Sequence, residues 1–290
     1  MSARKIEDSR AAPQPPEPAE IAEVEYATSD EHRTVRITPE QSTPGTRALA
    51  NEVPVALEFD GSPYAVMMLT PADLEDFAVG FALSERIIAR SDEIARVDVR
   101  YGTRGIGIDV RLEKEHSARL AERRRAIPGQ SGCGICGLTS IEEALPQLTL
   151  LTAAPKLVQK SLFRALESLP ARQTLNQTTG AVHAAAFCRS EGAILVVRED
   201  VGRHNAFDKV IGHLAREGLD PASGFALLTS RCSYELVQKA VLARIPILAS
   251  ISAPTELAVS IARNANLTLI ALARGDSALV FNDPFSSIAK

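Results

Sequence analysis

The sequence lacks tryptophan and is poor in aromatic residues and cysteine: of 290 residues, 4% are aromatic and four are cysteine. The small aromatic content argues against a platform on which nucleobases stack. Four unevenly spaced cysteines are too few for a disulfide-stapled extracellular scaffold. Charge or proline interrupts every apolar run before it reaches the roughly 18 residues that a membrane helix needs. These shortages predict a globular protein that does not span a membrane.

Neither sign of charge dominates the chain. It has 32 basic and 36 acidic residues, a formal net charge of -4 and a pI near 5.8. Because a dedicated nucleic-acid-binding protein usually carries a basic domain, we expect no nucleic-acid partner. The N-terminal residues also lack the basic start and apolar block of a secretory signal, so we expect a cytoplasmic protein with reduced thiols.

The composition changes along the chain and indicates a tail and two domains. Residues 1–33 are polar and proline-rich, with too little apolar surface to offset the entropy of ordering, and are predicted to form a disordered tail. Residues 34–127 show short strands and an amphipathic helix, typical of a small α+β domain. Residues 128–290 alternate apolar strands with amphipathic helices, which predicts an α/β domain with helices on both faces of its sheet.

Alternation, turn residues and helical spacing also predict individual elements. In the smaller domain a helix is expected directly after Thr70, with Thr70 as its N-cap and Pro71 in its first turn. The predicted strands are 53–59, 64–69, 94–99, 105–112, 181–187, 193–197, 225–228, 247–251 and 267–272. The other predicted helices are 118–125, one opening at Ser140, 157–169, 205–216, 234–243 and 256–264.

Two of the cysteines, Cys133 and Cys136, lie three positions apart between glycines. The glycines remove side-chain bulk, so a sulfur donor or acceptor can approach either thiol. Three interpretations stay open: a structural zinc site completed by Cys188, Cys232 or His183, a thioredoxin-like dithiol, and a carrier that holds a persulfide on one thiolate. No second cysteine pair and no thioredoxin pattern accompany the motif. Cys188 and Cys232 are otherwise predicted to be small core residues.

Polar residues gather where predicted strands end. One such stretch runs from Arg198 to Lys209, and it holds more polar residues than helix capping by Asp200 or Asn205 requires. Arg231 follows the next strand, Ser252 and Thr255 follow another, and Arg274 to Ser277 follow the last. Such residues offer backbone N–H groups and positive charge to an anion at the carboxyl edge of a sheet. The pattern predicts a phosphate-rich ligand, although each group alone is also typical of an ordinary helix cap.

Several long blocks between about residues 50 and 285 resemble the formate dehydrogenase accessory sulfurtransferase family (FdhD/NarQ). The blocks are Asn51–Leu57, Ala65–Met68, Thr70–Phe81, the Cys133–Cys136 loop, Arg198–Lys209, Tyr234–Lys239, Ile245–Ala249 and Ser252–Thr255. The resemblance implies a C-terminal domain with a cytidine-deaminase-like mixed sheet, helices on both faces, and a smaller α+β N-terminal domain. Deaminase chemistry itself is not expected, because His183 lacks the glutamate of a His-x-Glu motif.

The resemblance also implies an activity. A protein of this kind takes sulfur as a persulfide from a cysteine desulfurase and passes it to the molybdenum cofactor, in its bis-molybdopterin guanine dinucleotide form, for the catalytic subunit of formate dehydrogenase. The persulfide falls on Cys133, with Cys136 as its partner, and the protein is expected to form a homodimer without a permanent metal. The family's cofactor-contacting stretch falls on Ala273, Arg274, Gly275, Asp276, Ser277 and Ala278.

Other residues receive roles from the two lines of argument combined. Arg231, Arg274, Ser252 and Thr255 are expected to face the pyrophosphates, whereas His204 and Lys209 are expected to lower the pKa of the persulfide or orient a ligand of the metal. The alternative from another functional class is a chaperone that binds the molybdenum cofactor for formate dehydrogenase without covalent sulfur transfer.

Overall fold

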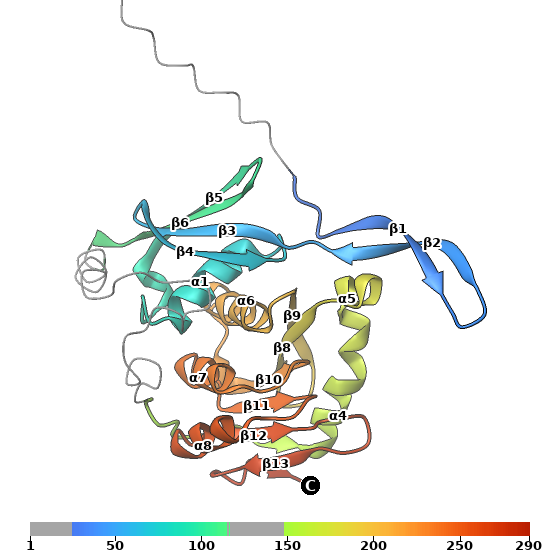
Figure 1. The fold of residues 1–290 in the computed structure, drawn as a ribbon. Coiled ribbons are helices and arrows are strands. Elements are labelled where there is room, and N and C mark those ends of the chain that lie inside the picture. The colour runs from blue at the N-terminus through green and yellow to red at the C-terminus, as the bar shows by residue number, and fades with distance from the viewer. Residues whose placement is uncertain (1–24, 115, 117–147) are drawn as a thin grey trace, which may run out of the picture.

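The computed structural model describes residues 25–114, 116 and 148–290. The predicted helix at 118–125, the helix opening at Ser140 and the domain boundary at 127/128 lie outside these residues. The described chain forms two main sheets, each with its own hydrophobic core, and Figure 1 shows the smaller lobe lying above the larger one. No helix in this part of the chain combines the length and the apolar character needed to cross a membrane.

The smaller lobe is a four-stranded sheet with one helix packed against it. Strand order is β4-β3-β6-β5, in which β3 pairs antiparallel with β4 and parallel with β6. The alternation of β3 places Val55, Leu57 and Phe59 in the core, where Phe77 and Phe81 of α1 meet them. This α+β arrangement was predicted. Its elements are β3 (Val53–Phe59), β4 (Ser62–Leu69), α1 (Leu74–Ser84), η1 (Ser91–Glu93), β5 (Ile94–Gly102) and β6 (Gly105–Leu112).

The larger lobe is built on a six-stranded mixed sheet of order β13-β12-β11-β10-β8-β9. Strands β10, β11 and β12 run parallel, whereas β8 is antiparallel to both β10 and β9, and β13 is antiparallel to β12. The strands are β8 (His183–Arg189), β9 (Ile194–Asp200), β10 (Gly224–Leu228), β11 (Ile247–Ser250), β12 (Thr268–Ala271) and β13 (Leu279–Asn282). A short parallel pair, β7 (Leu157–Val158) with β14 (Ile288–Ala289), lies beside it.

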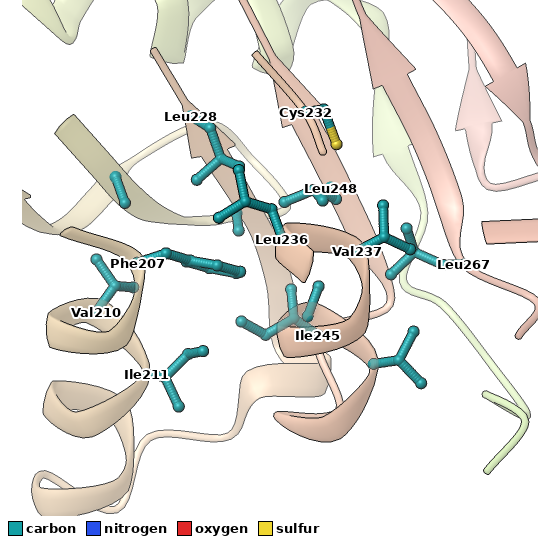
Figure 2. Close-up of a cluster of buried hydrophobic side chains, with 14 of the residues drawn as sticks. Phe207, Val210, Ile211, Leu228, Cys232, Leu236, Val237, Ile245, Leu248 and Leu267 are labelled. Atoms are coloured by element: carbon teal, nitrogen blue, oxygen red, sulfur yellow. The ribbon is translucent and has the colours of Figure 1, made fainter. Parts of the chain in front are cut away.

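Helices cover both faces of this sheet, as predicted. On one face, α6 and α7 pack side chains such as Phe207 and Leu236 onto Leu228 and Leu248, as Figure 2 shows, and α8 joins the same core. On the other face, α4 packs through Leu162 and neighbouring residues. The likeness to the cytidine-deaminase fold stays a prediction. The helices are α4 (Gln159–Ser168), η2 (Pro170–Arg172), α5 (Thr174–Thr179), α6 (Arg203–Arg216), η3 (Pro221–Ser223), α7 (Tyr234–Leu242) and α8 (Glu256–Asn264).

One hairpin was not predicted from the sequence. Strand β1 (Ser29–Ile37) pairs with β2 (Ser42–Ala50) and begins inside the range 1–33 that was predicted to be a disordered tail. The ribbon projects from the body of the molecule (Figure 1), and Val35 and Ile37 on it are exposed. Because neither face is buried in a core, its sequence lacks the apolar alternation by which a strand is recognised. Its contact with the body includes a 2.9 Å hydrogen bond from Arg47 to the Thr179 carbonyl.

The start of α1 also differs from the prediction. The helix begins at Leu74, and Asp73, in a left-handed conformation with φ of 52°, occupies the N-cap position. The Thr70 hydroxyl instead accepts a hydrogen bond from the Val201 amide at 3.1 Å, and the Thr70 amide donates to Asp200 at 3.1 Å. The Thr70 hydroxyl, which was expected to cap α1, therefore binds the Val201 amide of the larger lobe instead.

The two lobes meet where α1 crosses α6 with their backbones in contact. A Cβ atom at Gly80 of α1 would lie 1.8 Å from the Asp208 carbonyl oxygen, and one at Gly212 of α6 would lie 1.8 Å from the Asp76 carbonyl oxygen. No real side chain fits at such distances, so the crossing requires glycine at both positions.

The variant Gly80→Ala should therefore destabilise the protein. Alanine is the better helix former by about 1 kcal/mol, but the helices must separate to admit the methyl group, and overpacking costs about 1–3 kcal/mol or more. Since a separation also strains the contacts around the crossing, we expect a net loss of about 2 kcal/mol in the free energy of unfolding, measured by chemical denaturation.

Gly275→Ala is the matched control, because a Cβ atom there meets nothing within 4 Å. It should change stability by less than about 0.5 kcal/mol. Equal stability of the two variants would show that the helices do not need the close approach.

Candidate functional site

The polar groups predicted to line a ligand come together at one edge of the larger sheet. The carboxyl ends of β10, β11 and β12 lie there with the end of β9 and the start of β8, because the chain directions bring them to the same side. Hydrogen bonds join the loops: the Ser250 hydroxyl donates to the Ser230 carbonyl at 2.7 Å, and the Leu272 amide donates to the Ser252 carbonyl at 3.1 Å. We call this region the carboxyl edge.

The loop after β12 presents an exposed turn. The Arg274 amide donates to the Ser277 carbonyl at 2.8 Å, which leaves Gly275 and Asp276 at the tip. Ala273 is buried and Ala278 is partly buried. The loop leaves the sheet through Leu272, whose φ of 51° is rare for a non-glycine residue and costs energy at the edge itself. The stretch predicted to contact the cofactor is thus an outward turn on a strained stem.

Side chains on the neighbouring loops differ in what they offer to a ligand. Arg231 is exposed, as is Arg274, and among the described residues neither arginine pairs with a carboxylate; Ser252 is partly buried. Thr255 is exposed, but its hydroxyl accepts a 3.2 Å hydrogen bond from the Ala258 amide and caps α8. For Thr255 the ordinary capping alternative is therefore the one that the structure supports. Ligand binding by the others stays a prediction.

His204 lies at the start of α6 with a partner that the sequence did not indicate. Its Nε2 atom is 3.6 Å from Oε2 of Glu235, in the first turn of α7. The neighbouring His204 ring and the Ser233 hydroxyl outweigh burial and lower the pKa of Glu235 to about 2. Glu235 was part of a recognised block, yet no local spacing relates position 235 to position 204, since the two helices are joined only by the fold.

His183 at the start of β8 belongs to the same group. Burial, followed by the charges of Arg203 and His204, lowers the pKa of His183, and the Asp200 carboxylate opposes this effect only in part. These effects favour the neutral form of His183. Burial is the main cause of the shift, and the positive charges of Arg203 and His204 at this corner of the carboxyl edge add to it.

Lys209 does not belong to the site, which corrects its predicted role. Its side chain is fully buried, and its Nζ atom lies 2.7 Å from Oδ2 of Asp200 and donates to the Thr70 carbonyl at 3.1 Å. An ammonium in such a place neutralises a buried carboxylate and has no exposed surface that a ligand could contact.

Most of the polar residues between 198 and 209 serve the contact between the lobes. Arg198 and Arg216 both pair with Asp76 of α1, at 2.7 and 2.6 Å. On the other side of the crossing, Asp208 accepts hydrogen bonds from Lys239 at 2.8 Å and from Ser84 at 2.7 Å. The excess of polar residues over capping needs was correctly noticed, but its main cause is this interface.

The two described cysteines are structural, as predicted. Cys188 and Cys232 are fully buried, and burial raises the pKa of each thiol to about 12. Cys188 lies at the opposite end of β8 from His183, so these two do not share a zinc site. Within 25–114, 116 and 148–290, no three His, Cys, Asp or Glu side chains are grouped to hold a metal ion. Cys133 and Cys136 lie outside the described residues.

A cavity of about 730 Å³ lies at the opposite, amino edge of the sheet. Its walls include His116, Leu151, Val241 and Arg244, and the Leu151 amide donates to the carbonyl of Ala265 at the end of α8. His116, which pairs with Glu93 at 2.9 Å, and the residues from 149 onward flank the stretch that carries Cys133 and Cys136. The two ends of that stretch therefore start from the amino edge.

The variant Lys209→Met should lower the free energy of unfolding and should not lower the affinity for a ligand directly. It leaves the Asp200 carboxylate buried without its cation, which typically costs about 3–5 kcal/mol. Denaturation of the single variant and of Asp200→Asn with Lys209→Met should show partial recovery in the double variant. A stable single variant with reduced ligand affinity would restore Lys209 to the site.

Cys188 and Cys232 should resist alkylation in the native protein. A thiol with a pKa near 12 and no exposed surface is almost never a thiolate at pH 8. Mass spectrometry after brief treatment with iodoacetamide should find both unmodified, and both should be modified after unfolding in guanidinium. Rapid native modification of either would contradict the burial.

Comparison with known proteins agrees with the sequence and the fold. Residues 50–287 match the FdhD/NarQ family. A "Sulfur carrier protein FdhD" of Xanthomonas campestris is 49% identical over 236 residues, 81% of this chain and 84% of that protein, and its counterpart in Variovorax paradoxus is 47% identical over 237 residues, 82% and 85% of the two chains.

A solved structure supports the same family relationship from the fold. It is the crystal structure of a protein assigned as a formate dehydrogenase accessory protein from Desulfotalea psychrophila. The TM-score is 0.73 at 25% identity, and the match covers 91% of this chain and 100% of that one. From the sequence match and this shared fold together, the chain belongs to the FdhD/NarQ family.

Proposed function

We propose that the protein is a sulfur carrier that accepts persulfide sulfur from a cysteine desulfurase. It delivers the sulfur to the molybdenum cofactor, as bis-molybdopterin guanine dinucleotide, for the catalytic subunit of formate dehydrogenase. The names of the relatives, a sulfur carrier and a formate dehydrogenase accessory protein, support the general role. The identities of donor and acceptor come from the resemblance of the sequence blocks.

The burial of Cys188 and Cys232 is the observation that supports this proposal, because it shows which cysteines are unsuited to carry sulfur. The chain has four cysteines, and these two are buried thiols with a raised pKa. Sulfur chemistry requires a thiolate that a donor can reach. The remaining cysteines are Cys133 and Cys136, whose flanking glycines leave the thiols sterically open. Of these two, the resemblance to the family assigns Cys133 as the carrier and Cys136 as its partner.

The transfer balances with these two thiols. The Cys133 thiolate attacks the terminal sulfur of the donor persulfide; a new S–S bond forms on Cys133, the donor S–S bond breaks, and the donor cysteine leaves as a thiolate that takes up a proton. The Cys136 thiolate then attacks the inner sulfur, forms a disulfide with Cys133 and releases sulfide to the acceptor metal. A dithiol reductant restores both thiols for another cycle.

The carboxyl edge provides the place for the acceptor. Arg231 and Arg274 supply exposed positive charge to pyrophosphate groups, and the turn from Arg274 to Ser277 offers backbone groups beside them. The ends of the cysteine stretch start at the amino edge, but Cys133 follows His116 by 17 positions. At about 3.4 Å per residue such a chain spans up to about 58 Å, well beyond the length of a strand of this sheet. Covalent connection thus permits Cys133 to meet partners at either edge. A homodimer is part of the proposal.

The decisive experiment loads the protein with sulfur. After incubation with a cysteine desulfurase and cysteine, the peptide that contains Cys133 should gain about 32 Da, the mass of one sulfur atom, whereas Cys133→Ala should gain none. Cys188→Ala is the matched control and should load normally, because its thiol is buried.

Two results would contradict the carrier. One is a wild-type protein that gains no sulfur while it still supports formate dehydrogenase, which favours a chaperone that binds the cofactor. The other is a Cys133→Ala variant that still activates formate dehydrogenase in cells without the native protein. Guanine-nucleotide binding by Cys133→Ala is expected to stay near normal, and it shows that this variant is folded.

A further inference from the structure

The outer edge of β1 is an open strand edge on the projecting ribbon. β1 and β2 form a sheet of two strands and pair along the whole of β1, from Ser29 to Ile37. α5 contacts the ribbon through β2, where Arg47 donates to the Thr179 carbonyl, and β1 lies on the side away from α5 (Figure 1). Within the part of the chain that the structure describes, no strand pairs with the outer edge of β1. Every second residue of β1 therefore directs its backbone N–H and C=O groups to solvent.

The ribbon by itself is a weak structure. An isolated two-stranded hairpin is marginally stable at best in water, and an open edge pairs readily with another strand. Val35 and Ile37 on β1 are 61% and 78% exposed, so the body of the molecule does not cover them. β2 contains Pro44, which lacks a backbone donor, whereas β1 contains no proline. The edge of β1 is therefore the one that can accept a further strand along its whole length.

The charges of β1 make this strand complementary to a second copy of itself. Its first half carries Asp30 and Glu31, its second half carries Arg33 and Arg36, and all four side chains are exposed. Two copies that pair antiparallel about a twofold axis, with all nine residues overlapping, place Arg33 at the axis. Asp30 of each copy then lies opposite Arg36 of the other, and Glu31 lies diagonally beside Arg33 of the other. A parallel pairing in register would place like charges beside one another.

We propose that the β1 edges of two copies of this chain pair antiparallel and join the two ribbons into one four-stranded sheet. This inference rests on the homodimer of the proposed function and deepens it, because it names the surface through which the copies meet. The interface is isologous, so each copy contributes the same residues and each contact occurs twice. The two added strand neighbours satisfy the open backbone groups, and the opposite charges set the register.

Arg36→Asp tests the pairing most directly. It places an aspartate opposite Asp30 in both symmetric contacts, and we expect the dissociation constant of the dimer to rise about 30-fold. Asp30→Arg should weaken the dimer to a similar extent, although it also removes a 2.8 Å hydrogen bond from Asn51. The double variant with both substitutions exchanges the two signs and should dimerise nearly as well as the wild type. Sedimentation velocity of the full chain over a series of concentrations measures all four proteins.

Glu40→Arg is the matched control, because Glu40 is an exposed acidic residue in the turn after β1 and lies outside the paired strand. It should dimerise as the wild type does. Protection of Cys188 and Cys232 from iodoacetamide should show that every variant is folded. The inference is overturned if the wild type stays monomeric at every concentration or if Arg36→Asp dimerises as tightly as the wild type. It is overturned as well if the double variant is no tighter than the single ones.

Sulfur loading of Cys133 in the wild type and in Arg36→Asp separates this inference from the proposed function. A protein that loads normally and forms a dimer unaffected by the reversals removes the β1 interface and leaves both the carrier and the homodimer. A protein that never accepts sulfur, but whose dimer follows the charges of β1 as expected, removes the carrier and supports the interface.

Discussion

The contact between α1 and α6 is the constraint on which the rest of the molecule depends. Gly80 and Gly212 bring the two helix backbones together, and no larger residue fits there without displacing a carbonyl group. The close approach positions Asp76 and Asp208 for ion pairs with Arg198, Arg216 and Lys239 around the crossing. Because removing one partner of a buried pair is far more costly than the pair is worth, this network holds the lobes in one relation.

That relation also determines what is left for chemistry. The strand end at Asp200 carries carboxylate, lysine, asparagine and histidine within a few residues, yet Asp200, Asn205 and Lys209 satisfy one another and the loop at Thr70. Arg203 and His204, about one and a half turns before Lys209 in α6, lie where the interface ends. The His204 ring and the Ser233 hydroxyl both interact with the Glu235 carboxylate of α7. The short stretch from Asp200 to Lys209 thus contains residues that hold the lobes together and residues that face the carboxyl edge.

The two edges of the larger sheet have different properties. The carboxyl edge gathers loops from four strands, exposes Arg231 and Arg274 and holds the cluster around His204. The amino edge holds a cavity whose walls include residues that flank the stretch with Cys133 and Cys136. The strands β9, β10, β11 and β12 cause this separation because they run in the same direction, so that the loops after them all emerge at the carboxyl edge. A carrier with separate places for donor and acceptor fits such a sheet.

The sequence by itself determined most of the strands and helices of both lobes, though not α5 or β13, and it determined the edge at which polar groups gather and the inert character of Cys188 and Cys232. These features follow from periodicity and residue type, which are local. It could not show the β1–β2 ribbon, which buries no apolar face, or the start of α1, where Thr70 turned to the other lobe. Only the tertiary structure decided that Lys209 is buried against Asp200 and that His204 faces Glu235. The choice of partner for a polar side chain depends on groups that the fold brings near, and those groups leave no periodic trace along the chain.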